Sequence, residues 1–523
     1  MITDKFCEEG CAVKRFLFLA LVVLISVFVF SSQLNVAVLG EVRSLNPFLV
    51  KSAAERIVVG HLYETLLTQR SGQVVGALAE DFQVDFSDNS LILKLRDRKF
   101  HDGSFVSADD VVFSFNYILQ KRLPLGPILA YFTGAEKIDE KTVKLKFRTM
   151  NVSMLSFAPM AIPIIPKSVW EKIEKPLEFP NIERPIGSGV LMFEKLTAQS
   201  VVMKFFKDHP DAPKQLDGMV FHIVQDETMG FLGLVKGDYD YLFWNLDPEL
   251  AKQIMENPNK YPNVKVALIE GGVVNVILFN HRKSPMDDVN FRKAVLHALN
   301  YRELVEKVYS GLADVASLGL IPKRAKAVYD ESVGPVQQNV SMAKELLKKS
   351  NYDGKKLTLL VSSDRKAMDM AEYIKLYLKN VGIQVELDVQ GPEGLTTKLK
   401  KADFDLALYS YSLGSHPEMV FYHLHSSRGE MKNGQVVGFN YGGVNIPELD
   451  SALQAIWMAF SEKDRVEAFS RLQKLLAEVV PVVPLLVPVD IEAYSVKNFT
   501  GWVVSPTEGV MNVETLKSLK PAR

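Results

Sequence analysis

One short stretch of the chain gathers side chains that could bind a metal ion. His416, Glu418, His423 and His425 lie within ten residues of one another. Imidazole nitrogens suit transition metals, and His423 and His425 would project to one face if the segment were extended. The same residues are also compatible with an ordinary surface loop. Metal binding is therefore an alternative, and we expect neither a resident metal nor another cofactor.

Signatures of catalysis are absent from the sequence. It contains no Gly-x-Ser-x-Gly, no His-Glu-x-x-His and no Walker A motif. Gly187-Ser188-Gly189 lacks the Lys-Ser/Thr that a phosphate loop requires, so we interpret it as a turn before a strand. Asp109-Asp110 follow Ser107 at the spacing of a helix start, which favours capping over acid–base chemistry. We expect a protein that is not an enzyme, with an exported hydrolase as an alternative.

Composition excludes several other classes of protein. The 523 residues carry 61 Lys+Arg against 62 Asp+Glu, a balance that argues against a nucleic-acid binder. Hydrophobic residues make up 47% and charged residues 24%, as in ordinary globular proteins. A chain of this length exceeds what one hydrophobic core supports, so two or three packed units are expected.

The N-terminus has the pattern of an export signal. Lys14-Arg15 precede an apolar run over 16–30, and small residues follow. We therefore expect a signal peptide over 1–32, with an uncleaved membrane anchor as the alternative. Both cysteines, Cys7 and Cys11, precede the apolar run, so the processed chain would have no cysteine.

Strands and helices are expected to alternate along the rest of the chain. The apolar run 34–39 predicts a buried strand, and 52–69 predicts a helix with apolar residues near one face. Asn300 and Glu303 have the spacing of a capping box. A helix through Met370 and Leu378 should end at Gly382, directly before a strand over 383–387. This alternation indicates an α/β fold.

Several motifs occur together in a characteristic order. They comprise Leu45-Asn46-Pro47, Leu62-Tyr63-Glu64-Thr65-Leu66, Phe100-His101-Asp102-Gly103, Pro185-Ile186-Gly187-Ser188-Gly189, Lys207-Asp208-His209-Pro210, Gly237-Asp238-Tyr239-Asp240 and Asp287-Asp288-Val289-Asn290-Phe291-Arg292. The ordered set resembles the family 5 extracellular solute-binding proteins, which include the oligopeptide, dipeptide and nickel binders of ABC importers.

The resemblance implies a two-lobed periplasmic-binding-protein fold of type II, in its large cluster C form. Lobe I would comprise 33–280 plus 490–523, with an inserted subdomain over roughly 60–170, and lobe II would comprise 281–489. The chain would leave lobe I near Phe279 and return near Asp490. A monomer in the periplasm would capture a peptide-like or other small polar solute between the lobes and deliver it to a membrane permease. A nickel or metal-complex binder and a sensor without transport are alternatives within the same fold.

The sequence departs from the peptide-binding members where they hold the α-amino group of the ligand. Those members carry an aromatic residue and then an Asp that pairs with the ammonium, because an unpaired buried charge is costly. Tyr411 takes the aromatic position here, but the Asp position falls on Leu413 or Gly414. Either the ligand lacks a free N-terminal amine, or another acid supplies the charge; Glu64, which matches a ligand-facing Glu of oligopeptide binders, is the best substitute.

Further ligand-binding residues follow from the same resemblance. Arg365 falls near a residue that meets the ligand's C-terminus, and Arg forms bidentate pairs with carboxylates. Trp244 and Asn245 follow a strand that often reaches the cleft, and Trp stacks on flat groups. The complete set that we expect to bind the ligand is Tyr63, Glu64, Trp244, Asn245, Asn275, Arg365, Tyr409, Tyr411, Ser412 and His416.

Overall fold

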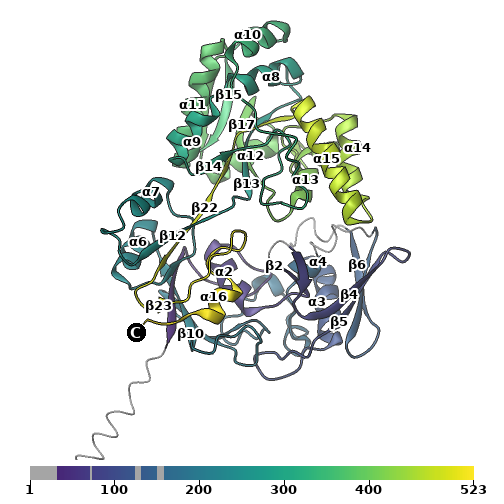
Figure 1. The fold of residues 1–523 in the computed structure, drawn as a ribbon. Helices are drawn as coiled ribbons and strands as arrows, with labels where there is room; N and C mark the ends of the chain where they lie inside the picture. Colours follow the sequence, from purple (N-terminus) through teal and green to yellow (C-terminus); the bar gives the residue numbers. More distant parts are fainter. Residues whose placement is uncertain (1–31, 71–72, 124–130, 150–157, 523) are drawn as a thin grey trace, which may run out of the picture.

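The computed structural model describes residues 32–70, 73–123, 131–149 and 158–522. The predicted leader lies outside this part of the chain, except for its last residue, Ser32. Both cysteines also lie outside it. The described residues form two α/β lobes, one above the other in Figure 1. None of the helices in these ranges has the length and apolar character needed to cross a membrane.

A seven-stranded mixed sheet forms the centre of lobe I. Its strands, in spatial order, are β12 (Val264–Ile269), β22 (Asp490–Ser495), β11 (Tyr241–Leu242), β1 (Gln33–Leu39), β10 (Gly218–Val224), β9 (Ser200–Phe205) and β8 (Leu191–Leu196). β1 pairs in parallel with β10 and β11, and the other pairs are antiparallel. Leu34, Val36, Ala37 and Val38 are buried, as the apolar run predicted.

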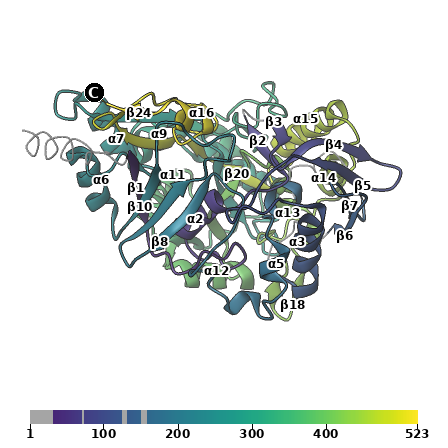
Figure 2. The same ribbon diagram turned by 90° about the horizontal axis from the view of Figure 1, so that it is seen from below.

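A smaller antiparallel sheet forms a subdomain of lobe I within the range expected for an insertion. Its order is β4 (Ala79–Asp85), β5 (Ser90–Leu95), β7 (Thr142–Phe147) and β6 (Phe132–Lys137). Helix α3 (Ala108–Lys121) packs against it and begins with the predicted cap, because Ser107 and Asp110 form a reciprocal capping box. Seen from below, this sheet and α6 (Glu227–Lys236) lie at opposite ends of lobe I (Figure 2).

Short elements complete lobe I. They are α2 (Ala53–Leu62), β2 (Leu67–Arg70), β3 (Gln73–Gly76), α4 (Ala158–Ala161), α5 (Lys167–Trp170), α7 (Pro248–Glu256), α16 (Val513–Ser518), β23 (Phe499–Thr500) and β24 (Lys520–Pro521). The helix expected over 52–69 is wrong beyond Leu62, because Tyr63 is extended and β2 pairs with β3 as a hairpin. Tertiary pairing overrides the helical pattern there.

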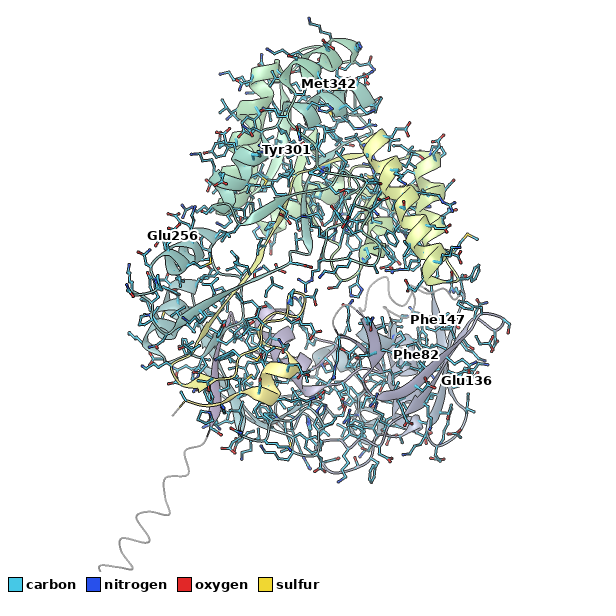
Figure 3. All side chains as sticks on the ribbon, in the orientation of Figure 1. Phe82, Glu136, Phe147, Glu256, Tyr301 and Met342 are labelled. Atoms are coloured by element: carbon cyan, nitrogen blue, oxygen red, sulfur yellow. The ribbon has the colours of Figure 1, made fainter. Side chains whose placement is uncertain are left out.

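Lobe II is built on a five-stranded sheet. Its order is β16 (Val385–Gln390), β15 (Leu357–Ser362), β17 (Leu406–Ser412), β13 (Val273–Phe279) and β20 (Val482–Pro484). The surrounding helices are α8 (Val289–Ala298), α9 (Tyr301–Tyr309), α10 (Val340–Lys349), α11 (Arg365–Val381), α12 (Pro392–Lys401), α13 (Val420–Leu424), α14 (Pro447–Trp457) and α15 (Glu462–Val479). Short strand pairs are β14 (Ala313–Val315) with β21 (Leu486–Pro488), and β18 (Met431–Lys432) with β19 (Gln435–Val436). In Figure 3, the labelled residues Tyr301 and Met342 lie in lobe II. Phe82 and Phe147 lie on the small sheet of lobe I.

Two segments of the chain cross between the large sheets. β13 belongs to the sheet of lobe II, so the first crossing runs through residues 270–272, before the expected boundary at 280. The second crossing, at Val489, lies beside the expected return at Asp490. Arg324 of lobe II ties the two crossings together, because its Nη1 donates to the Glu270 carbonyl (3.0 Å) and to Asp490 Oδ2 (2.9 Å).

The lobes also meet away from these crossings. Trp457 at the end of α14 stacks on Tyr131 of lobe I, with ring centroids 5.6 Å apart. Phe460, before α15, meets Phe86, in the turn between β4 and β5, edge-on at 5.5 Å. α14 and α15 reach down to the small sheet in Figure 1, on the side of the molecule away from β12 and β22. The described lobes are therefore in contact on two sides.

Candidate ligand-binding site

A cavity of about 500 Å³ lies on lobe I beside α2, β2 and α16. These elements lie on the side of lobe I that is turned toward lobe II (Figure 1). Arg56, Tyr63, Glu64 and His209 are among its lining residues. The Arg56 side chain is exposed and forms no ion pair among the described residues.

Glu64 lines this cavity but already has charged and polar partners within lobe I. Its Oε2 lies 3.1 Å from Arg98 Nε, and both side chains are largely buried. His209 Nδ1 accepts the Asp211 backbone N–H, so its Nε2 carries the hydrogen that bonds to Glu64 Oε1 at 3.2 Å. A buried carboxylate needs such partners. The role of Glu64 as the anchor of a ligand ammonium stays a prediction.

Tyr63 also lines the cavity, but its hydroxyl group forms hydrogen bonds within lobe I. Asn181 Nδ2 donates to the hydroxyl at 2.7 Å, and the hydroxyl donates to the Leu45 carbonyl at 3.4 Å. Burial raises the pKa of Tyr63 although the Asn181 hydrogen bond opposes that shift. Its ligand contact, as predicted from sequence, would therefore involve the ring more readily than the hydroxyl.

Two of the sequence motifs meet next to this cavity. The His101 ring bonds to the backbone of both motif glycines, with Nε2 2.9 Å from the Gly189 carbonyl and Nδ1 accepting the Gly187 N–H at 3.3 Å. The Gly189 N–H donates to the Leu62 carbonyl at the end of α2. A Cβ atom on Gly189 would lie 2.2 Å from the His61 carbonyl oxygen, so only glycine fits. The segment 187–189 is the predicted turn into β8.

A second cavity, of about 390 Å³, lies on lobe II. It is formed by the ends of β15 and β17, the start of β13 and the first turn of α11, next to the crossing at 270–272. Two predicted residues, Asn275 and Tyr409, line it together with Tyr309, Asp364, Lys366 and Ser410. Burial raises the pKa of Tyr409 to about 12.

Four of these lining residues were missed at the sequence level: Tyr309, Asp364, Lys366 and Ser410. Asp364 caps α11 through its Oδ1, which accepts the Ala367 N–H at 3.1 Å. It forms no ion pair with any residue in the described ranges. Lys366 Nζ lies 2.7 Å from Asp247 Oδ2 of lobe I. The Ser-Ser-Asp sequence before a helical pattern signalled the cap of α11, but only the fold brings Tyr309 beside it.

Arg365, the cation predicted to meet the ligand, lies outside the lobe II cavity, and the next residue, Lys366, lines it. The Arg365 side chain is 86% exposed, and among the described residues the one carboxylate that it approaches is that of Asp369, at 3.9 Å. Arg365 does not line either cavity, whereas its neighbour Lys366 lines the one on lobe II. Successive helical residues point about 100° apart, which accounts for the difference.

Trp244 and Asn245 lie on lobe I near the second crossing. The Trp244 ring packs against Gly230 of α6, where a Cβ atom would come within 2.3 Å of it. Asn245 accepts the Ile491 N–H at 2.9 Å and donates to Asp490 Oδ1 at 3.2 Å. Asn245 thus holds the start of β22, Trp244 packs on α6, and neither residue lines the two cavities.

Tyr411 is buried, with 1% of its surface exposed, and stacks on His423 at 4.1 Å between ring centroids. It contacts Tyr409 at 5.9 Å, so it lies one ring behind the cavity wall. The expected role of Tyr411 in the cleft stays a prediction: its ring lies on the same face of β17 as Tyr409, two residues away, and packs on His423. Ser412 is exposed at the end of β17.

The loop after β17 is held by the first crossing. The backbone N–H groups of Leu413 and Gly414 both donate to the Gly272 carbonyl at 2.9 Å. His416 follows in this loop, and burial lowers its pKa although Glu418 opposes the shift. Glu418 itself is buried and accepts hydrogen bonds from Arg465.

The histidine stretch does not gather into a metal site. His423 lies in helix α13, so the segment 423–425 is not extended and its two histidines do not share a strand face. His425 bonds instead to Ser427 and Gln454. Across the described ranges, no three His, Cys, Asp or Glu side chains are placed to share one metal ion.

Comparisons with known proteins agree with this architecture. The family model for bacterial extracellular solute-binding proteins, family 5 Middle, matches residues 73–433. The peptide transport periplasmic protein SapA of Salmonella typhimurium is 24% identical over 508 residues, which cover 89% of this chain and 88% of SapA.

Solved structures share the whole two-lobed fold. The ABC transporter substrate-binding protein CtaP of Listeria monocytogenes has a TM-score of 0.81 at 23% identity, covering 94% of this chain and 99% of CtaP. The oligopeptide-binding protein AppA of Bacillus subtilis, in complex with a nonapeptide, has a TM-score of 0.72 at 22% identity, covering 94% of this chain and 99% of AppA. Because the family model spans most of the sequence, the chain belongs to family 5 of the bacterial extracellular solute-binding proteins.

Proposed function

We propose that this protein captures a peptide-like solute between its lobes and delivers it to the permease of an ABC importer. It would act as a monomer in the periplasm, after export by its N-terminal leader, and would leave the solute chemically unchanged. The observation that carries the proposal is the pair of partly polar cavities, one on each of two lobes that are joined by two crossing segments.

Capture requires that the solute contact both lobes. A solute that touches both lobes only when they are closed shifts the population toward the closed form. Moving that equilibrium from about 1:99 to 99:1 needs on the order of 5.5 kcal/mol of differential binding. The names of SapA and of the AppA–nonapeptide complex support a peptide as the class of solute.

The chemistry of the lobe II cavity also favours a peptide-like solute. The loop 413–416 has no carboxylate to pair with an α-ammonium group. Asp364 lines the same cavity with its Oδ2 unused by the helix cap, and it supplies that charge instead. A carboxylate facing a cavity is a suitable partner for a desolvated ammonium.

The test is binding to the protein purified without refolding. Native mass spectrometry should show a co-purified mass of peptide size, and calorimetry with a pool of di- to tetrapeptides should give saturable binding. Asp364→Asn should weaken that binding, whereas Asp369→Asn, one turn further along α11, should not. Failure of every peptide to bind ligand-free protein contradicts the proposal.

A further inference from the structure

Three polar side chains in the lobe II cavity form one continuous hydrogen-bond chain. Ser410 Oγ donates to Asn275 Oδ1 at 2.9 Å, and Asn275 Nδ2 donates to the Tyr309 hydroxyl at 2.9 Å. The three residues come from β17, β13 and the last residue of α9. All three line the cavity.

The amide of Asn275 gives this chain a direction. Its oxygen can only accept and its nitrogen can only donate, so the Tyr309 oxygen is used as an acceptor. The hydroxyl hydrogen of Tyr309 is then left over, and no described residue accepts it. Tyr309 is 9% exposed, and a buried donor without an acceptor is unfavourable.

We propose that Tyr309 donates this hydrogen to the first carbonyl oxygen of a bound peptide, and that Asn275 is the positioning residue that directs it there. The inference deepens the proposed function, on which it rests. It assigns the lobe II cavity to the N-terminal residue of the solute.

The surroundings of Tyr309 suit that assignment. Asp364 lines the same cavity, so the ammonium group and first carbonyl of one residue could meet Asp364 and Tyr309 together. Burial is the main reason that the pKa of Tyr309 is raised; Asp364 adds to the shift and the Asn275 hydrogen bond opposes it. The hydroxyl therefore keeps its hydrogen at neutral pH and remains a donor.

The two cations nearby, Lys366 and Arg365, do not provide the same contact. Lys366 Nζ is paired with Asp247 of lobe I. Arg365 is exposed and lies outside the lining. Tyr309 thus supplies a neutral donor next to a carboxylate, which distinguishes a peptide N-terminus from a free anion.

Removal of the hydroxyl group tests the proposal. The probe is the tightest-binding tripeptide from a pool with free termini, measured by calorimetry. Tyr309→Phe should weaken its binding about tenfold, the loss expected for one hydrogen bond. The matched control is Tyr377→Phe, which removes a hydroxyl that bonds to Glu303 in lobe II but does not line the cavity.

A change in the peptide gives a second measurement that does not depend on how the variant folds. Replacing the first peptide bond of the probe with an alkene isostere removes the carbonyl oxygen. This should weaken binding to the wild-type protein about tenfold and have little further effect on Tyr309→Phe. Asn275→Leu should lower affinity in the wild-type background and add little to Tyr309→Phe, since it acts through that hydroxyl.

The outcomes separate the two proposals. If no tripeptide binds the wild-type protein, the proposed function fails and this inference fails with it. If tripeptides bind and either Tyr309→Phe or the isostere binds as tightly as its parent, only this inference is overturned.

Discussion

Lys366 Nζ of lobe II lies 2.7 Å from Asp247 Oδ2 of lobe I, so one ion pair joins the starts of helices α11 and α7. Asp247 caps α7 with its other oxygen, which accepts the N–H groups of Glu249 and Leu250. Burial and the nearby Asp247 charge raise the pKa of Glu227, despite an opposing effect of Lys366. Lys366 is therefore attracted by acidic groups of lobe I.

Loss of this ion pair should favour the open form. Asp247→Asn keeps the helix cap but weakens the attraction across the lobes. Because both side chains are partly exposed, the pair is worth about 0.2–1 kcal/mol, and peptide affinity should fall only a few-fold. Small-angle scattering of ligand-free protein should show a larger radius of gyration. Glu372→Gln, which removes a pair within α11, is the control and should leave both quantities unchanged.

Removal of the negative charge of Glu64 should lower the free energy of unfolding. Glu64→Gln leaves Arg98 buried without its charged partner, and breaking a buried pair costs about 3 kcal/mol or more. Urea denaturation measures the loss in free energy of unfolding. Glu80→Gln, at an exposed pair with Lys94, should unfold like the wild-type protein. A stable Glu64→Gln protein that no longer binds peptide would show instead that Glu64 anchors the ligand.

Substitution by alanine should change the stability of the protein in opposite directions at Gly189, next to α2, and at Gly60, within α2. Gly189→Ala places a methyl group against the His61 carbonyl and should destabilise the protein by about 1–3 kcal/mol. Gly60→Ala adds a methyl group inside α2, where no described atom outside the local helix backbone lies within 4 Å, and should stabilise by about 0.5–1 kcal/mol. Thermal unfolding of the two variants compares them directly. Equal melting temperatures would mean that the turn at 187–189 can shift.

Burial of His423 should make the protein sensitive to acid. Burial lowers its pKa from 6.5 to about 4, so the folded protein resists protonation that the unfolded chain accepts. Stability is complete above pH 6.5 and is lost as the pH falls toward 4, by about 3 kcal/mol in all. His423→Phe keeps a ring against Tyr411 and should make unfolding free energy fall less steeply with pH. Burial also lowers the pKa of His281 to about 4. Part of the dependence of the unfolding free energy on pH should therefore remain in the variant. If the unfolding free energy of His423→Phe falls with pH as steeply as that of the wild-type protein, the lowered pKa of His423 is contradicted.

Much of the architecture could be predicted from local pattern. The caps at Ser107 and Asn300 and the left-handed Gly382 that ends α11 depend on neighbouring residues, and all three are present. The alternation of strands and helices and the ordered motifs indicated a two-lobed α/β protein, and that prediction is confirmed. These features are encoded locally, because capping groups and apolar periodicity act over a few residues.

The placement of the binding groups depended on tertiary structure. Periodicity did not reveal that Tyr409 lines the cavity while Tyr411, on the same face of β17, is buried behind it, or that Lys366 reaches the cavity and Arg365 does not. The path from α2 into β2, and the crossing at 270–272, were settled by strand pairing between distant segments. Asn275, Tyr309 and Ser410 are far apart in sequence, and their hydrogen-bond chain exists only because β13 pairs with β17 beside the end of α9. The sequence by itself determined which elements form; the packing of remote elements decided which side chains meet.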